Sequence, residues 1–137
     1  MTRLARLLAL TAAAPALADE AAVTHGMQAS LDFADDDPGI ILPRQLDETV
    51  FRAITVIDTR SADQVAAGAT PSAIDIDWHE VPTRIDEIPD TGLAVLFCNT
   101  GLLSAQATCA LRGAGRTNAV VLQTGIIGWQ ETAAYRP

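Results

Sequence analysis

The chain has 137 residues, which is enough for one domain with one hydrophobic core. Apolar residues make up 49% of the composition and charged residues 19%, so a globular fold is expected rather than a disordered chain. The net charge of −8 argues against binding to nucleic acid and to anionic membrane surfaces.

The first 18 residues have the pattern of a secretory signal peptide. Arg3 and Arg6 precede an apolar run at residues 7–14, and the Ala-Leu-Ala of residues 16–18 fits a small-x-small cleavage motif. The run is too short and too rich in alanine for a membrane span. The two arginines are not adjacent, so general secretion is favoured over a twin-arginine route. We expect residues 1–18 to be removed, with an uncleaved anchor as the alternative, and the mature protein to be periplasmic and free of the membrane.

Residues 19–38 are polar and acidic and end in three aspartates and a proline. This composition is typical of a mobile terminus. The folded domain is expected over residues 39–137, because no linker or internal repeat interrupts residues 40–134.

Five short apolar runs in this domain are typical of strands buried on both faces. They occupy residues 39–42, 54–57, 73–76, 93–97 and 119–122. Helical segments are expected between and after them, at residues 45–51, 61–68, 77–88, 104–113 and 128–134. The alternation predicts an α/β fold of three layers, in which a mostly parallel five-stranded sheet carries helices on both faces.

Local signals support three of these helices. Ser61 and Gln64 form a capping-box pattern, and Asp77 with Glu80 has the same spacing. In the helix expected from Ser104, one apolar stripe is predicted to face the core. That stripe consists of Leu103, Ala107, Ala110, Leu111 and Ala114.

The stretch that carries most chemical information is Leu-Phe-Cys-Asn-Thr-Gly-Leu-Leu-Ser at residues 96–104. Cys98 ends an apolar strand, a short glycine-containing loop follows, and Ser104 opens a helix. Backbone N–H groups of the loop and the positive end of the helix converge where a thiolate would lie, which lowers the pKa of a cysteine. Cys98 is therefore a candidate nucleophile, and the alternative is a small buried hydrophobe.

A structural disulfide between Cys98 and Cys109 is a second alternative in an exported protein. At 1.5 Å per residue, Cys109 lies about 7–8 Å along the helix from Ser104. Cys98 lies further back still, beyond the roughly 7 Å Cα separation that a disulfide can bridge. Cys109 is instead predicted to be a packing residue of the helix.

Four segments have the order and spacing seen in the rhodanese-like family, which this chain resembles over roughly residues 40–134. They are Val-Ile-Asp-Thr-Arg at 56–60, Gly-Ala-Thr-Pro-Ser-Ala-Ile at 68–74, the Cys98 loop, and Thr-Gly-Ile-Ile-Gly-Trp at 124–129. The resemblance implies a rhodanese-like fold and a sulfurtransferase. Cys98 would take a sulfane sulfur from a donor such as thiosulfate, hold it as a persulfide, and pass it to a thiophilic acceptor. A small molecule or a sulfur-carrier protein could act as partner, and no metal or organic cofactor is implied.

The resemblance also assigns roles to other residues. The backbone amides of the loop would bind the persulfide sulfur. This loop consists of Asn99, Thr100, Gly101, Leu102, Leu103 and Ser104. Asp58 and Arg60 would tie neighbouring loops together as a structural bracket, and Trp129 would be a packing residue. Gly125 matches one glycine of the family's double-glycine turn, and Thr124 replaces the other.

Departures from the family pattern bear on the donor. Many active members carry an arginine in the cysteine loop, whereas residues 99–104 have no charged side chain, and Ala69 replaces a frequent histidine. A neutral or protein-borne persulfide is therefore a competing donor. A non-catalytic sulfur carrier or partner-binding module is the competing function.

Three further classes of function lack support in the sequence. Related phosphatases use His-Cys-x5-Arg, but Phe97 precedes Cys98 and Ser104 stands at the arginine position. His25 and His79 share no ligand spacing with either cysteine, so no metal site is predicted. A glycine-rich nucleotide motif is also missing from the sequence.

Overall fold

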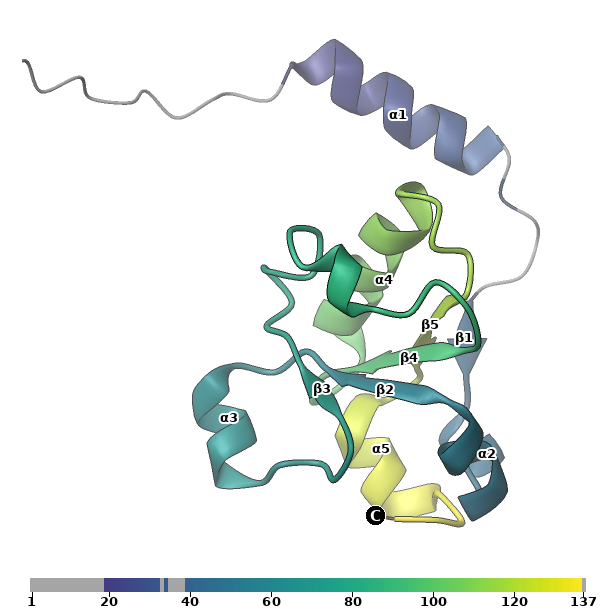
Figure 1. The fold of residues 1–137 in the computed structure, drawn as a ribbon, viewed down its shortest axis with the longest axis vertical. Coiled ribbons are helices and arrows are strands. Elements are labelled where there is room, and N and C mark those ends of the chain that lie inside the picture. The colour runs from purple at the N-terminus through teal and green to yellow at the C-terminus, as the bar shows by residue number, and fades with distance from the viewer. Residues whose placement is uncertain (1–18, 33, 35–38, 137) are drawn as a thin grey trace, which may run out of the picture.

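The computed structural model describes residues 19–32, 34 and 39–136 (Figure 1). The predicted signal peptide at residues 1–18 lies outside the described residues, and so do residues 35–38 of the acidic segment. In the described part of the chain, no helix is both long enough and apolar enough to cross a membrane.

Five parallel strands form one sheet in the order β1-β5-β4-β2-β3. They are β1 (Ile40–Ile41), β2 (Thr55–Asp58), β3 (Ile74–Asp75), β4 (Ala94–Phe97) and β5 (Ala119–Leu122). The strand β4 lies in the middle of the sheet, and its Val95 lies opposite Val56 of β2 and Val120 of β5. All five predicted strands are present, and the predicted α/β class with a five-stranded parallel sheet is confirmed.

Helical segments cover both faces of this sheet (Figure 1). The helices are α2 (Glu48–Ala53), α3 (Ala62–Ala67), α4 (Leu102–Gly113) and α5 (Gly125–Thr132), with short 3-10 turns at η1 (Pro43–Gln45) and η2 (Ile85–Glu87). On one face, Val95 and Phe97 pack with Trp129 of α5. On the other face, Ala94 and Leu96 pack with Leu111 of α4. Because neighbouring residues of β4 point to opposite faces, a fully apolar strand is needed at this position.

The helix α4 differs from its prediction in where it begins and in which face it buries. It begins at Leu102, and its buried residues are Ser104, Ala107, Thr108 and Leu111. Leu103, Ala110 and Ala114 of the predicted stripe are exposed, so that part of the prediction is wrong. Two residues of the buried stripe, Ser104 and Thr108, are polar. A stripe predicted from apolar residues alone therefore lies on a different face of the helix from the face that is buried.

Two other segments depart from the sequence-based expectation. Residues 77–88 form turns and η2 rather than a helix, although Val81 and Ile88 are fully buried in the core. Within the acidic segment, α1 (Glu20–Asp32) is helical, yet none of its residues is buried. It lies beyond α4, away from the sheet (Figure 1). That this segment is mobile remains a prediction.

Candidate active site

The loop that carries Cys98 follows directly from the central strand. The strand β4 ends at Phe97, and α4 begins four residues after Cys98, at Leu102. Between them Gly101 has φ +93°, a left-handed conformation that favours glycine. A Cβ at this position would lie 3.2 Å from the Leu122 carbonyl oxygen and 3.3 Å from the Thr124 nitrogen. Gly101 therefore allows the loop to turn sharply against the end of β5.

The thiol of Cys98 lies inside this turn and is surrounded by hydrogen-bond donors. The Gly101 N–H donates to Cys98 Sγ at 3.2 Å, and Ser104 Oγ lies 3.6 Å from the same sulfur. The Ser104 hydroxyl also lies 3.1 Å from the Gly101 carbonyl oxygen, so its single proton serves one of the two acceptors at a time. A sulfur anion would draw that proton toward itself.

These donors decide the direction in which the pKa of Cys98 moves. Burial is the largest single influence and raises the pKa, since only 3% of the residue is exposed. Hydrogen bonds from the Ser104 amide and hydroxyl, and from the amides of Thr100 and Gly101, act in the opposite direction. Together they outweigh burial, and the pKa of the thiol lies below its ordinary value. More of the thiol is therefore ionised near neutral pH, which makes it a better nucleophile.

The first turn of α5 contacts the cysteine loop through backbone hydrogen bonds. The Ile126 N–H donates to the Cys98 carbonyl oxygen at 2.8 Å, and the Ile127 N–H donates to the Asn99 carbonyl oxygen at 3.2 Å. Gly125 has φ +57°, and a Cβ there would overlap the carbonyl oxygens of Cys98 and Asn99. The Gly125–Ile127 segment thus fixes the position of the loop through its backbone. The sequence indicated only that Gly125 matches a glycine of the family's turn, and this contact with the loop was not predicted.

The six predicted loop residues contribute in different ways. Thr100, Gly101 and Ser104 supply the donors that act on the sulfur. Asn99 contributes its carbonyl to the contact with α5. The side chains of Leu102 and Leu103 point outward, with 72% and 39% of these residues exposed.

Asp58 and Arg60 form a buried bracket beside the loop. Arg60 Nε donates to Asp58 Oδ1 at 2.9 Å, and Arg60 Nη2 donates to Asp58 Oδ2 at 2.5 Å. The same Nη2 donates to the Gly68 carbonyl oxygen at 2.8 Å, which joins the end of β2 to the segment between α3 and β3. Both side chains are committed to each other and to the backbone, which fits a structural role.

The remaining candidate residues lie apart from the thiol. Cys98 and Cys109 are both free, and Cys109 is exposed on α4, so its predicted role as a packing residue is wrong. His79 pairs with Asp77 at 2.7 Å on the surface. Among the residues that the structure describes, no cluster of three or more histidine, cysteine, aspartate or glutamate side chains could hold a metal ion.

A family model described as a rhodanese-like domain matches residues 42–132, which is most of the chain. The chain belongs to the rhodanese-like family. The match includes β2, the Asp58–Arg60 bracket, the cysteine loop and all of α5, so the whole candidate site lies inside the family domain.

Individual relatives agree with this assignment. A protein named sulfurtransferase from Allochromatium vinosum is 33% identical over 76 residues, covering 56% of this chain and 71% of that protein. The crystal structure of a rhodanese-related protein from Thermoplasma volcanium superposes with a TM-score of 0.60 and 26% identity, covering 66% of this chain and 89% of that one. An NAD-dependent persulfide reductase from A. fulgidus has a TM-score of 0.50 and 31% identity over 57% of this chain, but only 14% of its own length is matched. The family and the sulfurtransferase relative support a sulfur-transfer role for this rhodanese-like domain.

Proposed function

We propose that this rhodanese-like domain is a sulfurtransferase that carries a sulfane sulfur on Cys98, with thiosulfate among its donors. The Cys98 thiolate attacks the outer sulfur of thiosulfate and forms a new S–S bond. The original S–S bond breaks, and sulfite leaves with the bonding electron pair. The product is a Cys98 persulfide, from which a thiophile such as cyanide or a thiolate takes the outer sulfur and regenerates the thiolate.

The observation that carries this proposal is the lowered pKa of Cys98 in a loop whose donors surround the sulfur. A persulfide anion would place its charge one bond further out, toward the same positive end of α4. A buried cysteine with only a packing role has no need for these donors. Their arrangement therefore supports nucleophilic sulfur chemistry at this position.

A two-substrate kinetic assay tests the proposal. With thiosulfate as donor and cyanide as acceptor, thiocyanate formation should follow ping-pong kinetics, giving parallel double-reciprocal lines. Cys98→Ser should abolish the reaction, while Cys109→Ser, a matched change at the exposed cysteine, should leave the rate unchanged. Equal rates in the Cys98→Ser variant and the wild type would contradict the role of Cys98.

A partner-binding or carrier role is the second candidate, and a separate observation favours it. Leu102, Leu103 and Ile127 are all exposed beside the cysteine loop, with 47% of Ile127 accessible. An apolar rim of this kind is suited to contact with a protein that delivers or receives sulfur. If Cys98 accepts sulfur from one partner protein while the turnover of thiosulfate is negligible, this result would favour the carrier role over the enzymatic role.

The location of the protein is a further part of the proposal. We propose that residues 1–18 are cleaved on export and that the mature protein works in a bacterial periplasm. The support is the Arg3–Ala18 sequence pattern alone. The intact mass of the protein recovered from a periplasmic fraction should correspond to a chain that starts at Asp19, and a full-length mass in the cytoplasm would contradict it.

A further inference from the structure

The threonine between Asp58 and Arg60 makes two hydrogen bonds to the end of β4. Thr59 is fully buried, and its N–H donates to the Phe97 carbonyl oxygen at 2.8 Å. This bond continues the pairing of β2 with β4, in which Asp58 lies opposite Phe97. The Thr59 hydroxyl donates to the same oxygen at 3.0 Å, in addition to the bond that the sheet requires. One residue therefore occupies both lone pairs of this carbonyl oxygen.

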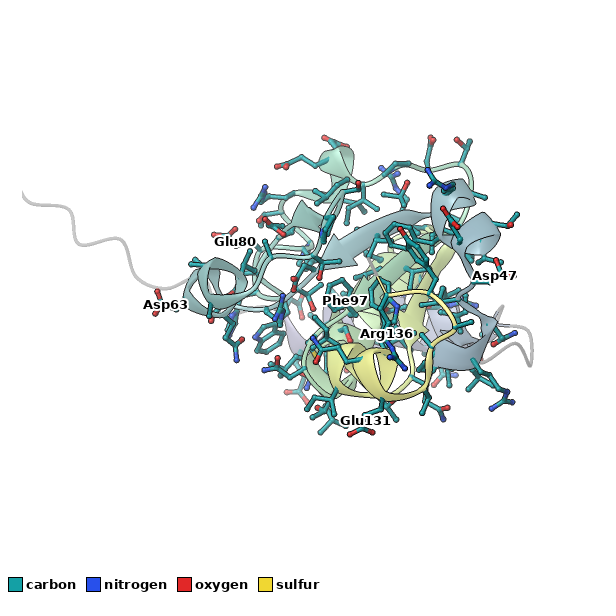
Figure 2. All side chains as sticks on the ribbon, turned by 90° about the horizontal axis from the view of Figure 1, so that it is seen from below. Asp47, Asp63, Glu80, Phe97, Glu131 and Arg136 are labelled. Carbon is teal, nitrogen blue, oxygen red and sulfur yellow. The ribbon has the colours of Figure 1, made fainter. Side chains whose placement is uncertain are left out.

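The carbonyl that Thr59 binds belongs to the peptide group that joins Phe97 to Cys98. A peptide group is planar, so hydrogen bonds to its oxygen also orient the N–H and the Cα of Cys98. The next peptide group is held from another side, because the Ile126 N–H donates to the Cys98 carbonyl oxygen at 2.8 Å. Figure 2 shows Phe97 inside the molecule beside α5, and its ring lies edge-on against Trp129 with 5.4 Å between the ring centres. The main chain is thus held on both sides of Cys98.

The position of the sulfur depends on this main chain. A single side-chain torsion separates the backbone of Cys98 from Sγ, so the direction of the backbone sets the positions that the sulfur can reach. In the structure Sγ lies 3.2 Å from the Gly101 nitrogen and 3.6 Å from Ser104 Oγ. Hydrogen bonds weaken steeply when donor and acceptor are misaligned. A small rotation of the Phe97–Cys98 peptide group would therefore weaken the contacts that favour the thiolate.

We propose that Thr59 is a positioning residue for sulfur transfer, whose hydroxyl acts through the Phe97 carbonyl to keep Cys98 Sγ aligned with the donors of the cysteine loop. The inference rests on the proposed sulfurtransferase function and adds a residue to its machinery. Thr59 acts through the main chain and not on the substrate. A packing role would need only the shape of the threonine side chain, which valine shares. A positioning role needs the hydroxyl, which serine shares.

The rate of iodoacetamide alkylation against pH tests the positioning, in proteins that all carry Cys109→Ser so that only Cys98 reacts. Thr59→Val should fold, because the Phe97 carbonyl keeps its backbone donor, and its curve should move to higher pH. The curve of Thr59→Ser should coincide with that of the protein with threonine at this position.

Thr108→Val is the matched control for the loss of a buried threonine hydroxyl. Thr108 is 4% exposed, and in the part of the chain that the structure describes its hydroxyl has no hydrogen-bond partner. Its curve should not move. An equal shift in Thr108→Val, or an unmoved curve in Thr59→Val, would overturn the positioning role.

Sulfur loading separates failure of this inference from failure of the function. At neutral pH, Thr59→Val should load from thiosulfate about threefold to tenfold more slowly, the effect of losing one neutral hydrogen bond, and Thr59→Ser should load at the unchanged rate. If the valine and serine variants load equally well or are equally impaired, the hydroxyl does not position the sulfur, and the sulfurtransferase proposal stands. If no donor loads the protein with Thr59 intact, the sulfurtransferase proposal fails. The alkylation curves then still decide the positioning of Sγ, since a shift confined to Thr59→Val supports it and no shift overturns it.

Discussion

At the scale of single residues, neutral donors rather than a neighbouring cation favour ionisation of the Cys98 thiol. Backbone amides and the Ser104 hydroxyl oppose the effect of burial on the thiol pKa. Amide donors are fixed by the turn at Gly101, whereas the Ser104 hydroxyl can turn between the sulfur and the Gly101 carbonyl. The hydroxyl is therefore the one donor that a substitution can remove without rebuilding the loop.

Ser104→Ala should raise the pKa of Cys98, because the hydroxyl that favours the thiolate is lost while the backbone donors stay. The thiolate fraction at a given pH then falls, and the curve of iodoacetamide alkylation rate against pH moves to higher pH. Wild type and variant should react at the same limiting rate once both are fully ionised. An unchanged curve would show that Ser104 has no part in the ionisation of Cys98.

At the scale of elements, the start of α5 is the part that holds the site together, and it contains an unusual residue pair. Thr124 has φ +63°, a conformation that β-branched residues rarely adopt. Its side chain occupies the space that a Cβ at Gly128 would need, since that Cβ would overlap Thr124 Oγ1. Gly128 is therefore expected to tolerate a larger residue only when Thr124 is replaced by a smaller one.

A double-mutant cycle tests this coupling. Thr124→Gly alone should stabilise the domain by about 1 kcal/mol, since it relieves the left-handed strain. Gly128→Ala alone should destabilise it by about 2 kcal/mol or more through overpacking. In the Thr124→Gly background Gly128→Ala should cost little, because the next atom, Pro43 Cγ, lies 3.6 Å from the added Cβ. Additive effects in urea unfolding would contradict the pairing.

The Asp58–Arg60 bracket gives a second prediction at this scale. Asp58→Ala leaves the buried guanidinium of Arg60 without its carboxylate, so unfolding free energy should fall by about 3–5 kcal/mol. Asp63→Ala, at an exposed site on α3, serves as the control and should cost less than about 1 kcal/mol. A loss for Asp58→Ala as small as that of the control would mean that the bracket adds no stability.

Much of this architecture could be predicted from the sequence, because buried parallel strands leave a strong signal. β5 occupies the predicted residues 119–122, and Ser61 with Gln64 caps α3 as its pattern indicated. The prediction of a helix over residues 77–88 was wrong. The capping spacing of this segment is also compatible with turns that bury two apolar side chains, so the spacing alone does not distinguish a helix from turns.

The candidate site was predictable only where it is local in sequence. The loop around Cys98 is contiguous, so strand, glycine and helix start can be read together. The N–H groups of Ile126 and Ile127, which donate to the carbonyls of Cys98 and Asn99, come from a segment far from the loop in sequence. No local pattern encodes such a long-range contact.

At the scale of the whole molecule, the described structure divides into a packed domain and a helix that adds little to its core. Both core clusters lie within residues 41–133, and α1 buries none of its residues. A chain without residues 19–34 should therefore keep its melting temperature to within about 2 °C, because little apolar area is lost. Its rate of sulfur loading should also be unchanged. A drop of about 10 °C would show that α1 is a structural part of the domain.

The central claim is that Cys98 takes up one sulfur atom, and intact-mass spectrometry after incubation with thiosulfate tests it most directly. The wild type and Cys109→Ser should each gain about 32 Da, the mass of one sulfur, and Cys98→Ser should gain none. Reduction with a thiol should remove the added mass. Wild-type protein that shows no gain with any sulfur donor, while Cys98 remains free to alkylate, would contradict the account.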